Sequence, residues 1–149
     1  MDNNINIEEN LLEPFLNLKG LLSQKVEYQS NENFLTFVKR MAPSIVSDFK
    51  MGNHIRVISD KLQDLEEGKI KRLMVFLPPR SSKSVICSKL FPAWYIGKHP
   101  EHEILTVSHS DQLSSDFGRS VRDVVNTEEF QKIFRGVQLR SDVRAAGKW

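Results

Sequence analysis

The sequence predicts an α/β fold in which a parallel sheet is flanked by helices and preceded by a helical N-terminal segment. Two short apolar runs, RLMVFL at 72–77 and EILTVS at 103–108, have the continuous hydrophobicity typical of strands covered on both faces. Each run is followed by a segment with the three- and four-residue spacing of a helix. Strand, loop, helix, strand and helix in this order are expected of a parallel sheet.

The first 43 residues are the helical N-terminal segment of this prediction. Apolar side chains recur every three or four residues over 11–22, which indicates a helix interrupted near Pro14. A second helix is expected over 34–41, where Pro43 would end it.

Residues 44–149 are expected to form the incomplete α/β unit. A helix over 52–67 places its apolar residues on one face, and Gly68 stands where a left-handed C-terminal cap belongs. The helix that follows the first strand, over 84–96, contains Pro92 and is expected to bend or break there.

Composition excludes several classes of protein. The single cysteine, Cys87, rules out an internal disulfide framework and a Cys-rich zinc site, and it fits a reducing compartment. The N-terminus lacks the basic and apolar stretches of a signal peptide, and no apolar run approaches the roughly 18 residues that cross a bilayer. The net charge of +2 does not by itself indicate a nucleic-acid partner. Basic residues without any acidic one nevertheless concentrate over 69–89.

The centre of that basic stretch, PPRSSKS, lies between the first predicted strand and a helix. Phosphate-binding loops read G-x-x-x-x-G-K-[ST] in this position, and the window 77–84 keeps the lysine and the serine but neither glycine. Glycine brings backbone amides close to phosphate most cheaply. If Ser82 takes a left-handed conformation in its place, the strain is on the order of 1 kcal/mol. The order of strand, loop and helix therefore favours a phosphate site of the P-loop NTPase type.

Residue types assign roles within this loop. Backbone amides would face the β-phosphate, assisted by the positive end of the helix. Lys83 would neutralise the β- and γ-phosphates, Ser84 would bind Mg²⁺, and Arg80 would stabilise charge during γ-phosphoryl transfer. We therefore expect ATP and Mg²⁺ as cofactors, with Arg80 and Lys83 as catalytic residues. The nucleotide-binding residues would be Pro79, Arg80, Ser81, Ser82, Lys83 and Ser84. A basic, proline-marked turn that binds no ligand is the alternative.

From about residue 49 onward the chain resembles the large subunit of terminase, the ATP-driven DNA-packaging motor of tailed bacteriophages and related viruses. Four segments carry the resemblance in order: GKIKRLMVFLPPRSSKS, FPAWYIGKHP, SHSDQLSSDFGRSVRDVV and RAAGKW. The family loop usually reads PPR-x-GKS, so Ser82 stands where glycine is more common, and Arg80 matches an arginine proposed to stabilise charge. Asn53 and His54 match a region that lines the adenine pocket, which makes His54 a nucleotide-binding candidate. A partly exposed helix-start residue, hydrogen-bonded to backbone, is the alternative for His54.

The resemblance implies ATP hydrolysis coupled to translocation of double-stranded DNA into a procapsid. Its implied partners are viral DNA, the terminase small subunit, the portal protein and further copies in a ring, in the host cytoplasm and without a membrane. Family members continue into a second acidic motif and a nuclease domain, and neither is visible in this sequence. The chain is therefore expected to stop inside the ATPase domain, and to bind nucleotide while lacking the residues for full hydrolysis and the nuclease. The alternatives are another P-loop ATPase, such as a helicase-like protein, and a non-catalytic truncated fragment.

Other polar groups are expected to be structural. Ser108 and Asp111 resemble a capping box, which explains the Ser/His/Asp composition of 108–111 better than a catalytic triad does. Glu128 and Glu129 fit a surface patch. Trp94 and Tyr95 are expected in the core. A solvated mixed-charge surface is the default for five arginines, with a role in a neighbouring subunit as the alternative: Arg119, Arg122, Arg135, Arg140 and Arg144.

Overall fold

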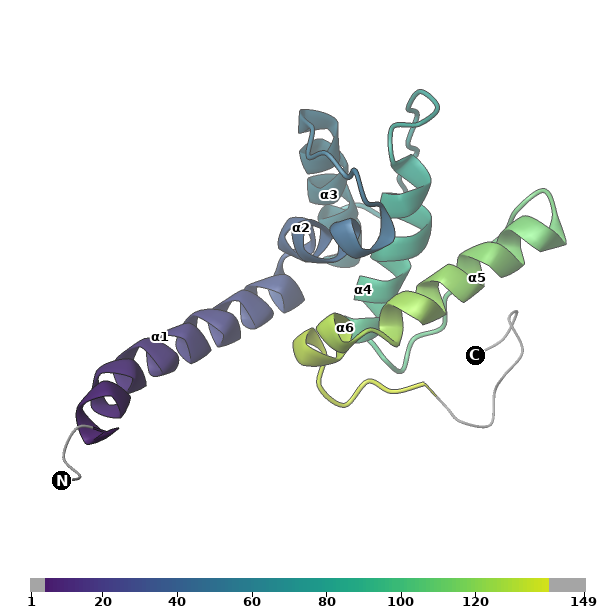
Figure 1. The fold of residues 1–149 in the computed structure, drawn as a ribbon. Coiled ribbons are helices and arrows are strands. Elements are labelled where there is room, and N and C mark those ends of the chain that lie inside the picture. Colours follow the sequence, from purple (N-terminus) through teal and green to yellow (C-terminus); the bar gives the residue numbers. More distant parts are fainter. Residues whose placement is uncertain (1–4, 140–149) are drawn as a thin grey trace.

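The computed structural model describes residues 5–139, and the side chains from residue 17 onward. Helices make up all the regular secondary structure of this part (Figure 1). In chain order they are α1 (Ile5–Glu32), α2 (Phe34–Ile45), α3 (Asn53–Glu66), the π-helix η1 (Val85–Leu90), α4 (Phe91–Lys98), α5 (Asp111–Val125) and α6 (Glu128–Ile133). No described helix combines the length and the hydropathy that crossing a bilayer requires.

The predicted α/β fold with a parallel sheet is wrong, because residues 5–139 contain no strand. Segment 72–77 is an irregular stretch with no ladder of backbone hydrogen bonds. Leu73, Val75 and Leu77 pack against the helical core, whereas Met74 and Phe76 are 79% and 81% exposed. The segment is thus covered on one side only, not on both as its sequence predicted.

The second predicted strand, 103–108, is also unpaired and even more open to solvent. Leu105 and Val107 are both largely exposed. An apolar run becomes a strand only when neighbouring backbone accepts and donates its ladder hydrogen bonds, and no described segment does so here. The runs are apolar, as the sequence shows, but their apolar character does not reveal whether another strand lies beside them.

Both N-terminal helices continue past the prolines that were expected to interrupt or end them. α1 runs through Pro14, and α2 includes Pro43 in its last turn. Pro43 is exposed, and so is Lys39, whose carbonyl would accept from the missing amide. The loss of that one hydrogen bond therefore does not stop α2.

α3 and the helix after the loop follow their predicted patterns more closely. Gly68 has a φ of +73°, as expected for a left-handed C-terminal cap. After the loop, η1 passes directly into α4, and the Phe91 amide bonds to the Ile86 carbonyl, five residues back. The change of helix type thus falls just before Pro92, which has no amide hydrogen to continue the ladder.

The core lies where α2, α3, η1, α4, α5 and α6 meet, while α1 projects away from them (Figure 1). The ring centroids of Phe34 and Trp94 are 5.2 Å apart, and those of Phe37 and Phe130 are 6.3 Å apart. Trp94 Nε1 donates to the Asn31 carbonyl at 2.9 Å, which ties α4 to the end of α1. This aromatic core fixes the helix that follows the candidate phosphate loop.

The start of α5 corrects a smaller prediction. Its N-cap is Ser110, whose hydroxyl accepts from the Leu113 amide at 3.3 Å, rather than Ser108 paired with Asp111. Asp111 is the first residue of the helix, where a carboxylate stabilises the positive end. The expected cap exists, displaced by two residues.

Candidate phosphate-binding site

The loop between segment 72–77 and η1 folds back on itself around a hollow of about 410 Å³. Residues 77–85 line this hollow, and they include Pro79, Ser81, Ser82 and every other predicted loop residue. Ser81 Oγ donates to the Pro78 carbonyl at 2.6 Å. That hydrogen bond, from a side-chain hydroxyl to a backbone carbonyl, closes the turn within the loop itself.

The backbone of the loop is left-handed at two residues that are not glycine. Arg80 has a φ of +62° and Ser82 a φ of +59°. A left-handed conformation costs a residue with a Cβ roughly 1–2 kcal/mol. Strained residues of this kind cluster at binding and active sites, where the surrounding structure stabilises them. Ser82 thus adopts the left-handed conformation that glycine takes most easily.

The helix after the loop begins with free amides directed toward the loop. Its first hydrogen bond runs from the Ile86 amide to the Ser82 carbonyl at 3.0 Å. The amides of Lys83, Ser84 and Val85 therefore precede the intrahelical ladder and have no partner within it. Free amides at a helix start, with the helix dipole behind them, are a general anion site.

Positive charge at the loop is not neutralised by any carboxylate of the described chain. Neither Arg80, which is exposed, nor Lys83, which is half-buried, forms an ion pair with residues in this range. The charge of the Lys83 ammonium also affects the pKa of Cys87, which lies one turn along η1. Burial raises the pKa of the Cys87 thiol, and the Lys83 charge opposes that rise. Ser84 is exposed, so its hydroxyl is accessible to a ligand.

His54 is not part of this hollow. It lies exposed in the first turn of α3, with its ring folded back over Gly52, where an added Cβ would come within 2.7 Å of ring atoms. The structure thus brings together the six loop residues but not His54. A role for His54 at a nucleotide base stays a prediction.

The remaining polar residues have local roles where the structure describes them. Glu128 and Glu129 are exposed in the first turn of α6, as expected of a surface patch. Arg119 pairs with Asp116 at 3.1 Å, and Arg135 with Glu27 at 3.3 Å. Trp94 is fully buried, as predicted, whereas Tyr95 is only partly so. Arg140, Arg144 and Trp149 lie outside the described residues.

Sequence reasoning missed one polar cluster, formed by His99, Glu101, His102 and Glu66 around the end of α4. Its only sequence signal is the spacing of two histidines and a glutamate in HPEH, because Glu66 joins from a distant helix.

Comparisons of the chain with family models, with curated proteins and with solved structures gave no match.

Proposed function

We propose that the loop Pro78–Ser84 binds the phosphates of a nucleotide, as part of a DNA-packaging ATPase of the terminase large-subunit type. The observation that carries the proposal is the pair of left-handed residues, Arg80 and Ser82, which wrap the loop around a hollow at the start of a helix. Residues other than glycine are rarely left-handed, and such positions cluster at active and ligand-binding sites.

The charges and donors around the hollow fit a polyanion. Free helix-start amides, the Lys83 ammonium and the Arg80 guanidinium all act on the same short loop. An exposed hydroxyl at Ser84 adds a ligand for the Mg²⁺ that accompanies a nucleoside triphosphate. These groups support ATP with Mg²⁺ as the ligand.

The proposal does not depend on a sheet. Because the predicted fold is wrong, the proposal is supported by the geometry of the loop and by the four segments that resemble terminases.

In the proposed reaction, water attacks the γ-phosphorus of ATP, and ADP leaves with the bridging oxygen. Lys83 and Arg80 would stabilise the charge that develops on the phosphoryl oxygens.

The partners belong to the same proposal. A packaging motor would act on double-stranded DNA in the host cytoplasm, at the portal of a procapsid. It would work as a ring of identical subunits together with a small subunit. The competing functions are a non-catalytic fragment, which would bind nucleotide weakly or not at all, and a helicase-like ATPase, which would use the same loop.

The binding step is tested by thermal unfolding with Mg-ATP. At about 100 times its dissociation constant, a ligand that binds only the folded state stabilises it by roughly 2.7 kcal/mol. We expect this stabilisation for the native chain and for Lys71→Ala, which removes an exposed lysine outside the hollow. Lys83→Ala should lose most of it. An equal shift in Lys83→Ala and Lys71→Ala would show that Lys83 does not contact phosphate.

Phosphate release separates the competing functions. A packaging ATPase that carries the second acidic motif should release phosphate from ATP faster when double-stranded DNA is added, and Arg80→Ala should slow that release. The absence of any stabilisation by Mg-ATP would favour the non-catalytic fragment, and ATP-dependent separation of the two strands would favour a helicase-like protein.

A further inference from the structure

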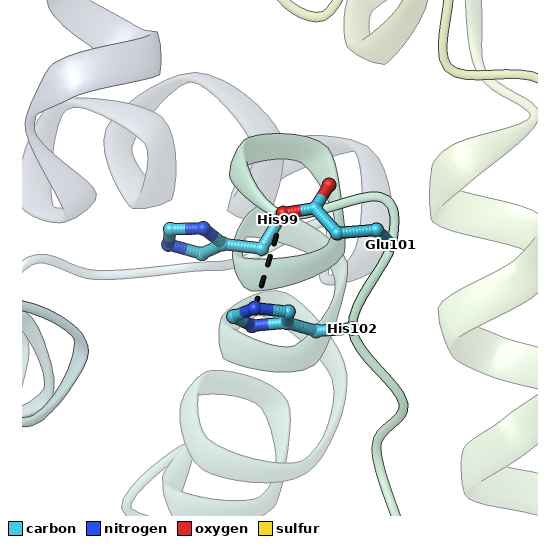
Figure 2. Close-up of side chains that lie close together, drawn as sticks. All are labelled: His99, Glu101 and His102. Atoms are coloured by element: carbon cyan, nitrogen blue, oxygen red, sulfur yellow. Dashed lines mark ion pairs between the residues drawn. The ribbon is translucent and has the colours of Figure 1, made fainter.

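A second polar cluster lies at the other end of the η1–α4 run from the phosphate loop. His99 follows the last residue of α4, and the His102 amide donates to the His99 carbonyl at 3.0 Å, which closes a turn. His99, Glu101 and His102 each offer one ligand atom, and these atoms lie within 4.8 Å of one another. Figure 2 shows the Glu101 carboxylate directed toward the His102 ring.

The imidazole of His99 is oriented by a buried carboxylate from α3. His99 Nε2 lies 2.9 Å from Glu66 Oε1, and the Glu66 side chain is only 5% exposed. With a carboxylate as its partner, Nε2 carries the proton and Nδ1 keeps its lone pair. Histidine ligands of metals characteristically donate their other N–H to a carboxylate in this way.

The second oxygen of the Glu66 carboxylate is an independent observation in favour of a positive charge near this cluster. Glu66 Oε2 is buried and has no hydrogen-bond partner among the described residues. A buried carboxylate oxygen without a partner is costly, and a positive charge nearby reduces that cost. Lys98 Nζ, 3.1 Å from Oε1, meets part of this need but does not reach Oε2 with a hydrogen bond.

His102 is oriented in a matching manner. Its Nδ1 lies 3.0 Å from the hydroxyl of Tyr95, a residue of α4. If Nδ1 donates to this oxygen, Nε2 is left with a lone pair, and it faces Glu101 Oε1 at 3.8 Å. Glu66 thus holds His99 at Nε2, and His102 lies between the Tyr95 hydroxyl at Nδ1 and Glu101 at Nε2.

We propose that His99, Glu101 and His102 form a binding site for a divalent transition-metal ion of the Zn²⁺ class, with Glu66 and Tyr95 as positioning residues. Two imidazoles and one carboxylate are ligands that suit Zn²⁺ and its neighbours rather than Mg²⁺. Glu101 brings the negative charge, while Lys98 and Glu66 neutralise each other.

The rings of His99 and His102 are stacked, with centroids 4.9 Å apart and planes 11° from parallel, so binding one ion requires one imidazole to rotate out of the stack. Tetrahedral bonds of about 2.0–2.1 Å place neighbouring ligand atoms about 3.3 Å apart. The largest separation of 4.8 Å closes to this value by side-chain rotation, since His102 and Glu101 are substantially exposed. Three protein ligands leave the fourth position for water or for another molecule, as in an open zinc site.

The test is titration of the whole chain with Zn²⁺ and, separately, with Co²⁺, whose visible absorption reports tetrahedral coordination. We expect one ion per chain. His102→Ala should weaken binding by about 10-fold or more and abolish the Co²⁺ spectrum, and Glu66→Gln should weaken it by about 10- to 100-fold. The matched control His109→Ala removes an exposed imidazole elsewhere and should leave binding unchanged.

Two outcomes would overturn the site. One is a native chain that binds neither ion or gives no tetrahedral Co²⁺ spectrum. The other is a His102→Ala variant that binds like His109→Ala while its circular dichroism remains native. Because His102 is exposed, its replacement should leave the fold intact, so a loss of binding would reflect loss of a ligand.

Discussion

At the scale of single residues, the most informative positions are two left-handed backbones without glycine. The sequence showed that Ser82 stands where phosphate loops usually have glycine, and the structure gives it a φ of +59°. Arg80 has the same kind of backbone, with a φ of +62°, and nothing in the sequence predicted that. The two conformations together curl the loop around its hollow.

Replacing Ser82 by glycine tests whether this strain is stored. Ser82→Gly removes a left-handed cost of roughly 1–2 kcal/mol but makes the unfolded chain more flexible by about 0.4–1 kcal/mol. The free energy of unfolding should therefore rise or stay level in urea titrations. The control Ser84→Gly, at a helical φ of −66°, should lower it by about 0.5 kcal/mol. A larger loss in Ser82→Gly than in Ser84→Gly would contradict a strained serine.

At the scale of elements, short side chains decide where helices begin. At the start of α2, α5 and α6, a side-chain oxygen accepts a hydrogen bond from a backbone amide of the first turn; the capping residues are Asn33, Ser110 and Thr127. Around α5 the sequence offers Ser108 and Ser110 two residues apart, and either could cap. The structure selects Ser110, because its extended backbone aims the hydroxyl at the Leu113 amide.

Alanine substitution separates the two serines. Ser110→Ala should lower the free energy of unfolding by about 1 kcal/mol, since it removes the cap of α5. Ser108→Ala should change it by less than about 0.5 kcal/mol, as for most surface substitutions. Chemical denaturation of both variants measures the difference. Equal losses would mean that the hydroxyl of Ser110 contributes no more than that of Ser108.

At the scale of the whole molecule, stability depends on aromatic packing between distant helices. Phe34 and Phe37 of α2 meet Trp94 of α4 and Phe130 of α6. The indole also donates to the end of α1. Because the centre of this core is side-chain packing between helices, no sheet is needed to form it.

Truncation of Trp94 should therefore be severe. We expect Trp94→Ala to lower the free energy of unfolding by about 3–5 kcal/mol, as buried aromatic truncations do. Tyr28→Ala, at a side chain that is 69% exposed, should cost less than about 0.5 kcal/mol. Urea unfolding followed by circular dichroism compares them. Similar midpoints would place Trp94 outside the stabilising core.

The sequence by itself determined the features that depend on nearby residues. It indicated helices by their apolar spacing, the left-handed Gly68 after α3, and the boundaries of the basic loop, because caps, turns and helical faces are set within a few positions.

Only the tertiary structure decided the features that depend on distant partners. Segments 72–77 and 103–108 are apolar, but a strand requires a neighbour, and none of the described chain pairs with them. Likewise Glu66 reaches His99 only because α3 packs beside the end of α4. Hydrogen bonds and contacts across the fold have no signature in local spacing, which is why the sheet was predicted and why HPEH did not reveal that Glu66 orients His99.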